Sequence, residues 1–288
     1  MADNGQRAME ALLARHGFHF SKSKGQNFLI DREIPYRIAE ASGADTTNGV
    51  LEIGPGIGAL SCELCRRANK VVAVELDTTL LPILDETMAA FDNFSVVSAD
   101  VLKLDLPALV RERFAGLTPI VCANLPYNIT TPVLTALIEA DCFESLTVLI
   151  QREVAQRLCA KPGTAAYGAF SVFMQYHTDP ELCFEVSNRS FIPMPKVTSA
   201  VLRATVRQTP PVSVADEAFF FRVVYAAFAL RRKTLVNSLT TAFGALGKEK
   251  LTELVVSCGL DAGIRGERLG LEEFARLSDA LQAAEARS

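Results

Sequence analysis

The chain has 288 residues, of which 49% are hydrophobic and 22% charged, so a packed core is possible and disorder of the whole chain is excluded. The 29 basic and 33 acidic residues give a net charge of −4, which excludes a globally basic nucleic-acid coat protein but not local basic patches. No apolar stretch approaches the roughly 20 residues that cross a bilayer, and the N-terminus resembles neither a secretory signal nor a transit peptide. We therefore expect a cytoplasmic protein that does not use a membrane.

The seven cysteines are expected to be reduced thiols, because the count is odd and the expected compartment is reducing. Cys62 and Cys65 form a C-x-x-C pair. A zinc site needs a second pair of ligands, and His16, His19 and His177 do not supply one at a familiar spacing. Two small apolar residues on one face of a helix explain the pair better, so we expect no metal.

The first thirty residues are polar and mildly basic, and apolar residues then follow a helical spacing over 32–42. Beyond them, short runs rich in β-branched residues alternate with segments of helical length, as in buried parallel strands joined by helices. The predicted strands are 50–53, 70–76, 94–97, 118–124 and 146–151, and the predicted helices between them are 59–68, 78–90 and 130–140. Two further runs, 181–187 and 200–206, fit an antiparallel edge. This order predicts an α/β fold with a doubly wound, mostly parallel sheet.

A second domain is predicted after the run QTPPVSV at 208–214, because two adjacent prolines fit neither a helix nor a central strand. Helical spacing returns over 215–240, 247–258 and 270–284. We therefore expect a first domain at 1–208, with an N-terminal segment at 1–30, and a smaller all-helical domain at 209–288. The second domain contains ten basic and ten acidic residues, so the acid excess lies in the first.

The run LEIGPGIG at 51–58 leads from a predicted strand through a glycine turn into a predicted helix. Gly54 and Gly56 have no Cβ, so the backbone there can approach a ligand closely. The spacing is G-x-G-x-G, whereas the dinucleotide fingerprint is G-x-G-x-x-G, and this disfavours a nicotinamide-dependent dehydrogenase. A purely structural tight turn is the alternative.

An acidic residue stands at the end of the next predicted strand, and another follows the strand after it. Glu75 lies 17 residues after Gly58, where its carboxylate can accept hydrogen bonds from both hydroxyls of a ribose. Asp100 follows the run 94–97, where its carboxylate can accept from an adenine amino group. Taken singly, a solvated strand-end acid and a capping aspartate explain them as well. Because the carboxyl ends of parallel strands meet at one edge, the combination predicts a nucleoside site.

An Asn-Leu-Pro-Tyr turn follows the predicted strand 118–124. The side-chain oxygen of Asn124 and the carbonyl of Leu125 are two acceptors in a turn that Pro126 stiffens, and Tyr127 adds a ring. Two acceptors and a stacking surface fit a planar base that carries an exocyclic amino group. The alternative is a proline-stiffened loop with a core tyrosine.

This turn, after an E-x-G-x-G-x-G run, resembles the S-adenosylmethionine-dependent adenine N(6)-methyltransferases. The run KGQNFL at 24–29 narrows the resemblance to the ribosomal RNA adenine N(6)-dimethyltransferases of the KsgA (RsmA) type. The run FIPMPKVTSAV at 191–201 is similar to that family's F-x-P-x-P-K-V-x-S-A-V segment, although Met194 stands where a proline is frequent. The run RRKTLVNSL at 231–239 is similar to its R-R-K and N-S-L signature. The matches extend from about residue 21 to 239.

The resemblance implies a Rossmann-like methyltransferase domain with S-adenosyl-L-methionine as cofactor. It implies cofactor contacts by Asn27, Leu29, Gly54, Gly56, Glu75, Asp100 and Asn124, and catalytic roles for Asn124, Leu125, Pro126, Tyr127 and Phe191. An adenine that donates both amino hydrogens to Asn124 and Leu125 can pyramidalise and direct its lone pair at the methyl group. Tyr127 and Phe191 would then stack on the unstacked base, although Phe191 fits a core position equally well.

The implied substrate is a pair of adjacent adenosines in the 3′-terminal hairpin loop of small-subunit (16S-type) ribosomal RNA, in an assembling subunit. We expect a monomer whose helical domain helps to hold this RNA. The candidate phosphate contacts are Lys22, Lys24, Arg152, Arg157, Lys161, Arg231, Arg232 and Lys233. For Arg231–Lys233, a solvated helix end is the alternative.

Two other functions stay open at this point. The chain could methylate large-subunit RNA, as the macrolide-resistance type of adenine methyltransferase does, although the runs 191–201 and 231–239 favour the small-subunit type. It could also be a ribosome-assembly binding factor whose methylation is secondary.

Overall fold

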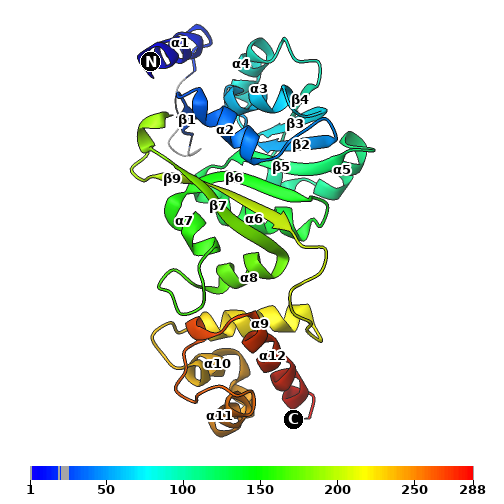
Figure 1. Ribbon diagram of the computed structural model, residues 1–288, viewed down its shortest axis with the longest axis vertical. Helices are drawn as coiled ribbons and strands as arrows, with labels where there is room; N and C mark the ends of the chain where they lie inside the picture. Colours follow the sequence, from blue (N-terminus) through cyan, green and yellow to red (C-terminus); the bar gives the residue numbers. More distant parts are fainter. Residues whose placement is uncertain (1, 19, 21–25, 288) are drawn as a thin grey trace. The chain divides into compact units, whose positions relative to one another are not determined.

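The computed structural model describes residues 2–18, 20 and 26–287. The chain forms two compact units, of which the first comprises 1–155 and 180–206 and the second comprises 156–179 and 207–288. Figure 1 shows the elements of both. The chain enters the second unit for the last time between residues 206 and 207, close to the domain boundary that the sequence predicts between 208 and 209. The predicted division places 156–179 in the first domain, whereas the contacts of this segment group it with the C-terminal helices in the second unit.

The first unit is built on a seven-stranded sheet with the order β4-β3-β2-β5-β6-β9-β7 (Figure 1). Its strands are β2 (Asn48–Ile53), β3 (Lys70–Glu75), β4 (Phe94–Ser98), β5 (Thr118–Asn124), β6 (Ser145–Gln151), β7 (Thr178–Val186) and β9 (Ser199–Val206). Strands β2 to β6 pair in parallel, and β9 pairs antiparallel with β6. The predicted α/β fold with its mostly parallel sheet is confirmed.

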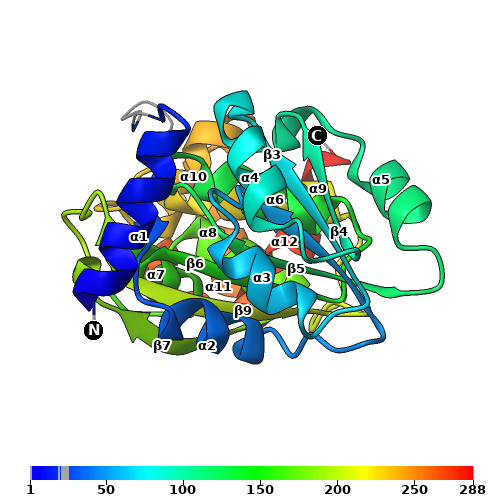
Figure 2. The ribbon, with the colours of Figure 1, turned by 90° about the horizontal axis from the view of Figure 1, so that it is seen from above.

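The central strands carry apolar residues on both faces, and these residues are buried. In β3, each residue from Val71 to Val74 is at most 2% exposed, which explains why the strand reads as a continuous apolar run. Helices α2 (Glu33–Ala41), α3 (Ala59–Cys65) and α4 (Leu81–Thr87) pack on this sheet through a cluster that contains Ile38, Leu64 and Leu84. Helix α6 (Thr130–Glu139) lies on the opposite side of the sheet from α2 (Figures 1 and 2). Helix α5 (Leu106–Arg113) precedes β5.

The N-terminal segment forms a helix, α1 (Ala2–Arg15), that the sequence analysis did not predict. Met9 and Leu13 of α1 are buried in a cluster with Phe28. Beyond the helix, the Nε2 atom of His16 lies 2.7 Å from Oε2 of Glu86 on α4. These contacts fix the segment beside the carboxyl edge of the sheet, where β1 (Phe28–Leu29) pairs with β8 (Phe191–Ile192).

The second unit is helical. It contains α8 (Ala169–His177), α9 (Glu217–Phe228), α10 (Leu235–Phe243), α11 (Lys248–Ser257) and α12 (Leu271–Glu285), and α7 (Arg152–Leu158) leads into it. Its core includes Phe220, Leu239 and Phe274, none of which is exposed. Among the described residues, no helix is long and apolar enough to cross a membrane.

The single helical segment predicted over 215–240 is wrong, because the chain forms two helices there. Helix α9 ends at Phe228, and Thr234 begins α10 with its hydroxyl accepting a hydrogen bond from the Asn237 backbone N–H. A threonine in this position satisfies one of the free donors at the start of a helix. Arg231–Lys233 therefore lie in the connection between two helices rather than at the end of one.

Candidate functional site

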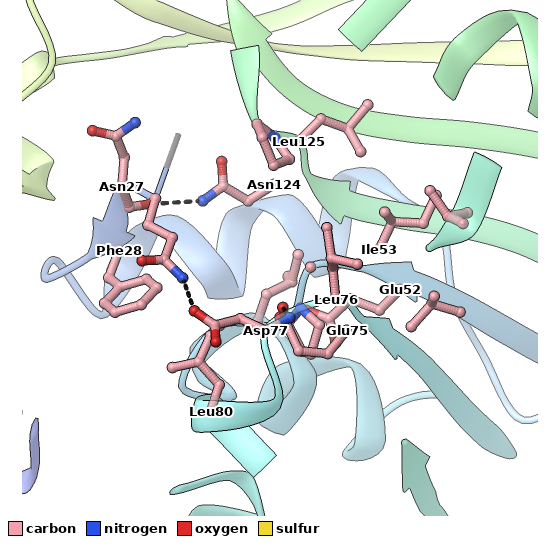
Figure 3. A pocket seen from close by; sticks show the side chains of 18 of the residues that line it. Asn27, Phe28, Glu52, Ile53, Glu75, Leu76, Asp77, Leu80, Asn124 and Leu125 are labelled. Atoms are coloured by element: carbon pink, nitrogen blue, oxygen red, sulfur yellow. Dashed lines mark hydrogen bonds between the residues drawn. The ribbon is translucent and has the colours of Figure 1, made fainter. Parts of the chain in front are cut away.

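A pocket of about 210 Å³ lies at the carboxyl edge of the parallel strands (Figure 3). Its walls come from the N-terminal segment and from the turns after β2, β3, β4 and β5. Residues from four strand ends meet there because the strands run in parallel. The predicted residues that line the pocket are Asn27, Leu29, Gly54, Gly56, Glu75, Asp100, Asn124, Leu125, Pro126 and Tyr127.

The glycine turn has a backbone that other residues would adopt only with strain. Gly56 has a φ of +60°, and a Cβ added there would lie 3.1 Å from the ring of Phe28. Gly58 has a φ of +88°, and its added Cβ would lie 2.9 Å from the sulfur of Met88. A tight turn therefore requires these glycines on structural grounds. Gly54 and Gly56 also form part of the wall of the pocket.

The carboxylate of Glu75 stands at the tip of β3 and is 6% exposed. Burial raises its pKa, while the backbone N–H of Asp77 stabilises the ionised form through a hydrogen bond of 2.7 Å to Oε1. Asp77 in turn accepts a hydrogen bond of 2.7 Å from Nε2 of Gln26. The N-terminal segment is thus attached to the tip of β3. Sequence reasoning missed Asp77 and Gln26, which only long-range contact reveals.

Glu52 is a second buried acid in this wall, and the sequence analysis did not single it out. It is 1% exposed, and its Oε2 atom has no hydrogen-bond partner within the described residues. Burial raises its pKa to about 8; the Ser61 hydroxyl opposes this shift and the Glu75 carboxylate adds to it. Its carboxyl therefore holds a proton at neutral pH. The sequence signal that could have identified Glu52 is a single acid inside the otherwise apolar run 50–53.

Asp100 lines the pocket after β4 and also caps a short turn. Its Oδ1 atom accepts a hydrogen bond of 3.1 Å from the Leu102 N–H at the start of η3 (Val101–Lys103). Its other oxygen lies 3.6 Å from Nζ of Lys103. The capping role considered from the sequence is therefore present, and the same side chain also faces the pocket.

Asn124 ends β5, and its amide is oriented by the N-terminal segment. Its Nδ2 atom donates a hydrogen bond of 3.1 Å to the carbonyl of Asn27, shown dashed in Figure 3. This hydrogen bond fixes the orientation of the amide, and the side-chain oxygen is the atom that can accept a hydrogen bond from a ligand. The next peptide is also fixed, since the Leu125 N–H donates to the Leu149 carbonyl at 3.1 Å. Asn124 and Leu125 thus have rigid supports.

The structure treats the two predicted stacking residues differently. Tyr127 lines the pocket, and its hydroxyl lies 2.6 Å from Oγ of Ser199. Phe191 is 2% exposed, packs in the core cluster of the sheet and is paired with Leu29 across β1 and β8. It is not one of the residues that line the pocket. This placement matches the core alternative considered for Phe191.

Most of the predicted RNA-binding cations lie in the second unit. Arg157, Lys161, Arg231, Arg232 and Lys233 are all exposed there. Arg152 belongs to the first unit, and Lys22 and Lys24 lie outside the described residues.

Contacts within the second unit bring two of the basic segments together. The guanidinium of Arg231 donates to the carbonyl of Ala165, and its Nε lies 3.9 Å from a carboxylate oxygen of Glu267. The backbone N–H of Gly163 donates to the Glu267 carbonyl at 2.7 Å. The loop that follows Lys161 therefore lies beside the connection between α9 and α10.

The C-x-x-C pair lies on α3. The thiol of Cys62 is 3.6 Å from the sulfur of Met88, and Cys65 is buried. In the part of the chain that the structure describes, no group of three or more His, Cys, Asp or Glu side chains could hold a metal ion.

A parallel sheet with this strand order, a glycine turn after β2, an acid at the tip of β3 and an Asn-Leu-Pro-Tyr turn after β5 define a Rossmann-like methyltransferase. The family model described as ribosomal RNA adenine dimethylase matches residues 17–282. The chain therefore belongs to the ribosomal RNA adenine dimethylase family.

Relatives and solved structures agree with this assignment. Two relatives are named ribosomal RNA small subunit methyltransferase A. The protein from Geobacillus thermodenitrificans is 49% identical to this chain, and the protein from Shouchella clausii is 47% identical. Each alignment covers 94% of this chain, and they cover 94% and 93% of the two relatives. The structure of the 23S rRNA methyltransferase ErmE is 28% identical, with a TM-score of 0.68 over 88% of this chain and 99% of that one.

A dimethyladenosine transferase from Plasmodium falciparum has the same fold, with a TM-score of 0.72 and 21% identity over 87% of this chain and 95% of that one.

Proposed function

We propose that this methyltransferase uses S-adenosyl-L-methionine to dimethylate the exocyclic amino groups of two adjacent adenosines in the 3′-terminal hairpin loop of small-subunit (16S-type) ribosomal RNA, during subunit assembly. The observation that carries the proposal is one pocket whose wall contains Asn124 and Leu125 together with the glycine turn, Glu75 and Asp100. The names of relatives 47–49% identical to the chain support the choice of RNA.

The lining of the pocket fits the proposed cofactor. The glycine turn brings backbone to the wall of the pocket, and Glu52 and Glu75 place two carboxyl groups there. Glu75 would accept from the ribose hydroxyls and Asp100 from the adenine amino group, while Gly54 and Gly56 would hold the methionine end.

Asn27 and Leu29 line the same pocket from the N-terminal segment and would close over the cofactor. When bound, the cofactor supplies a methyl group on a positively charged sulfur.

The residues of the turn after β5 would carry the transfer. In the first of the two transfers, the target amino group donates its two hydrogens to Asn124 Oδ1 and to the Leu125 carbonyl, which removes the lone pair from conjugation with the ring. Since the carbonyl of Asn27 already holds the Asn124 amide, the acceptor does not have to reorganise. No strong base is required, because the cationic product is acidic. Positioning therefore supplies most of the rate.

Substituting Glu75 with glutamine is expected to weaken the binding of S-adenosyl-L-methionine by about 10- to 100-fold, because a charged acceptor for the ribose hydroxyls becomes a neutral amide. Isothermal titration calorimetry measures this affinity directly. Glu139→Gln, at an exposed position at the end of α6, is the matched control and should bind as the wild type does. Wild-type affinity in Glu75→Gln would remove the ribose-binding role.

The second unit would hold the folded RNA through Arg157, Lys161, Arg231, Arg232 and Lys233, with Arg152, Lys22 and Lys24 contributing from the first. Their support is exposure in the second unit and the contact of Arg231 with the loop after Lys161. Cations of this kind read phosphates and shape rather than base sequence. We infer a cytoplasmic monomer that acts on an assembling particle.

The proposal is tested by transfer of labelled methyl groups to three acceptors: under-methylated small subunits, large subunits and protein-free RNA. Mass spectrometry of digested RNA then identifies the modified nucleoside. We expect dimethyladenosine in small-subunit RNA and much less in the other two. Label in large-subunit RNA would assign the macrolide-resistance type of activity instead. Tight binding to small subunits without any transfer would indicate a binding factor.

A further inference from the structure

A single hydrogen bond joins two sequence motifs at the carboxyl edge of the sheet. The hydroxyl of Tyr127 lies 2.6 Å from Oγ of Ser199, 72 residues further along the chain. Tyr127 begins η4 (Tyr127–Ile129), the turn that follows β5, whereas Ser199 is the first residue of β9. The contact reaches across the end of β6, which lies between β5 and β9 in the sheet.

Ser199 is held firmly by the sheet. Its side chain is not exposed to solvent, and its backbone stands opposite Gln151 in the antiparallel pairing of β9 with β6. The preceding peptide is fixed as well, since the Arg152 N–H donates to the Thr198 carbonyl at 3.0 Å. The hydroxyl of Ser199 is therefore a fixed point, whereas Tyr127 lies in a short turn.

The ring of Tyr127 is consequently fixed at both ends. Its backbone belongs to a turn in which the Ile129 N–H donates to the Pro126 carbonyl at 3.2 Å, and its hydroxyl is fixed by Ser199. Burial raises the pKa of Tyr127, so the phenol stays neutral and keeps this hydrogen bond at physiological pH. The faces of the ring are not used by the hydrogen bond.

The other aromatic side chains near the pocket are occupied in the core. Phe28 lines the pocket but packs against Phe18, with ring centroids 5.8 Å apart, and lies over Gly56. Phe191 is buried and does not line it. In the described part of the pocket wall, Tyr127 is thus the aromatic residue that lies beside Asn124.

We propose that Ser199 is a positioning residue for methyl transfer: its hydroxyl fixes the Tyr127 ring in the orientation on which the target adenine stacks. A fixed ring loses little freedom when a base stacks on it, so the base is presented to Asn124 in one orientation. The inference rests on the proposed function, and it explains why a serine of the 191–201 run is buried beside the turn at 124–127.

Replacing Ser199 with alanine is expected to lower kcat for RNA methylation about tenfold, which is the effect of losing one buried hydrogen bond. The loss should fall on kcat rather than on KM for RNA, because contacts elsewhere dominate RNA affinity. The affinity and stoichiometry of S-adenosyl-L-methionine binding should stay within twofold of wild type, which also shows that the variant is folded. Ser42→Ala removes an equally buried hydroxyl, bonded to the Ala39 carbonyl, and should leave kcat unchanged.

A second pair of variants separates positioning from stability. Ser199→Ala leaves the phenol of Tyr127 without its partner, whereas Tyr127→Phe combined with Ser199→Ala removes both polar groups. The double variant should recover the thermal stability lost in Ser199→Ala but not the lost kcat, and it should transfer methyl no more slowly than Tyr127→Phe alone. Recovery of kcat together with stability would show that Ser199 is merely structural.

The outcomes separate this inference from the proposed function. If the wild type transfers methyl groups to RNA and Ser199→Ala does so equally fast, the inference is wrong and the function stands. If the wild type transfers methyl groups to none of the three RNA acceptors, the function and the inference fall together.

Discussion

Replacing Asn124 with alanine is expected to lower the rate of methyl transfer by about 10²- to 10³-fold, the usual effect of removing one preorganised polar group from a reacting centre. The physical reason is that an amino group conjugated with the ring is a poor nucleophile. The Asn124 oxygen and the Leu125 carbonyl together favour its pyramidal form. With one acceptor gone, the lone pair returns to the ring and the remaining hydrogen bond no longer fixes its direction.

The measurement is single-turnover transfer at saturating cofactor, which isolates the chemical step from binding. Asn124→Asp adds a second comparison, because the carboxylate cannot donate to the Asn27 carbonyl and would repel it. It should therefore lose both rate and closure of the N-terminal segment. Asn69→Ala is the matched control, since Asn69 also donates its amide to a backbone carbonyl, that of Thr46 at 3.1 Å, but is exposed and precedes β3. Retention of more than a tenth of the wild-type rate in Asn124→Ala would contradict the assigned role.

The sheet and much of its edge could be predicted from the sequence because both depend on local patterns. A buried parallel strand shows as a short run of β-branched residues, and its polar tip shows as the first acid or amide that follows it. Glu75 and Asn124 stand at the end of such runs and Asp100 follows one, and parallel strand order then brings them to one edge. No contact between distant residues had to be known.

The features that local patterns do not decide depend on long-range contacts. Phe191 reads equally well as a stacking residue or a core residue until β8 pairs with β1 and buries it opposite Leu29. The segment 156–179 reads as part of the first domain until its contacts with the C-terminal helices are seen. The break after Phe228 depends on a cap at Thr234, which is a weak signal inside an apolar run. Asp77 and Gln26 are ordinary polar residues until the N-terminal segment is docked.

The buried carboxyl of Glu52 predicts how the stability of the protein changes with pH. Burial raises its pKa from 4.5 to about 8 in the folded state. Below pH 4.5 the group is protonated in both states, so its contribution is fully present. As the pH rises, the unfolded chain releases the proton while the folded chain keeps it, and stability falls by about 1.4 kcal/mol per pH unit. The loss is complete above the folded pKa and amounts to roughly 3–5 kcal/mol.

Replacing Glu52 with glutamine keeps the shape of the side chain and removes its ionisation, so this loss should disappear. At pH 8.5 the midpoint of thermal unfolding without ligand is expected to rise by roughly 5–10 °C over wild type, whereas at pH 4.5 the two should nearly coincide. Glu40→Gln, at an exposed position on α2, should follow the wild type at both values. If the unfolding midpoints of wild type and Glu52→Gln changed with pH in parallel, this would contradict the raised pKa assigned to Glu52.

A buried acid that destabilises the fold at neutral pH, on the wall of a pocket, is better explained by binding than by folding. A cationic cofactor beside Glu52 would favour its ionised form and return part of the lost stability. Saturating S-adenosyl-L-methionine should therefore raise the unfolding midpoint of the wild type at pH 8.5 by more than that of Glu52→Gln. An equal rise in both proteins would mean that Glu52 does not interact with the charge of the cofactor.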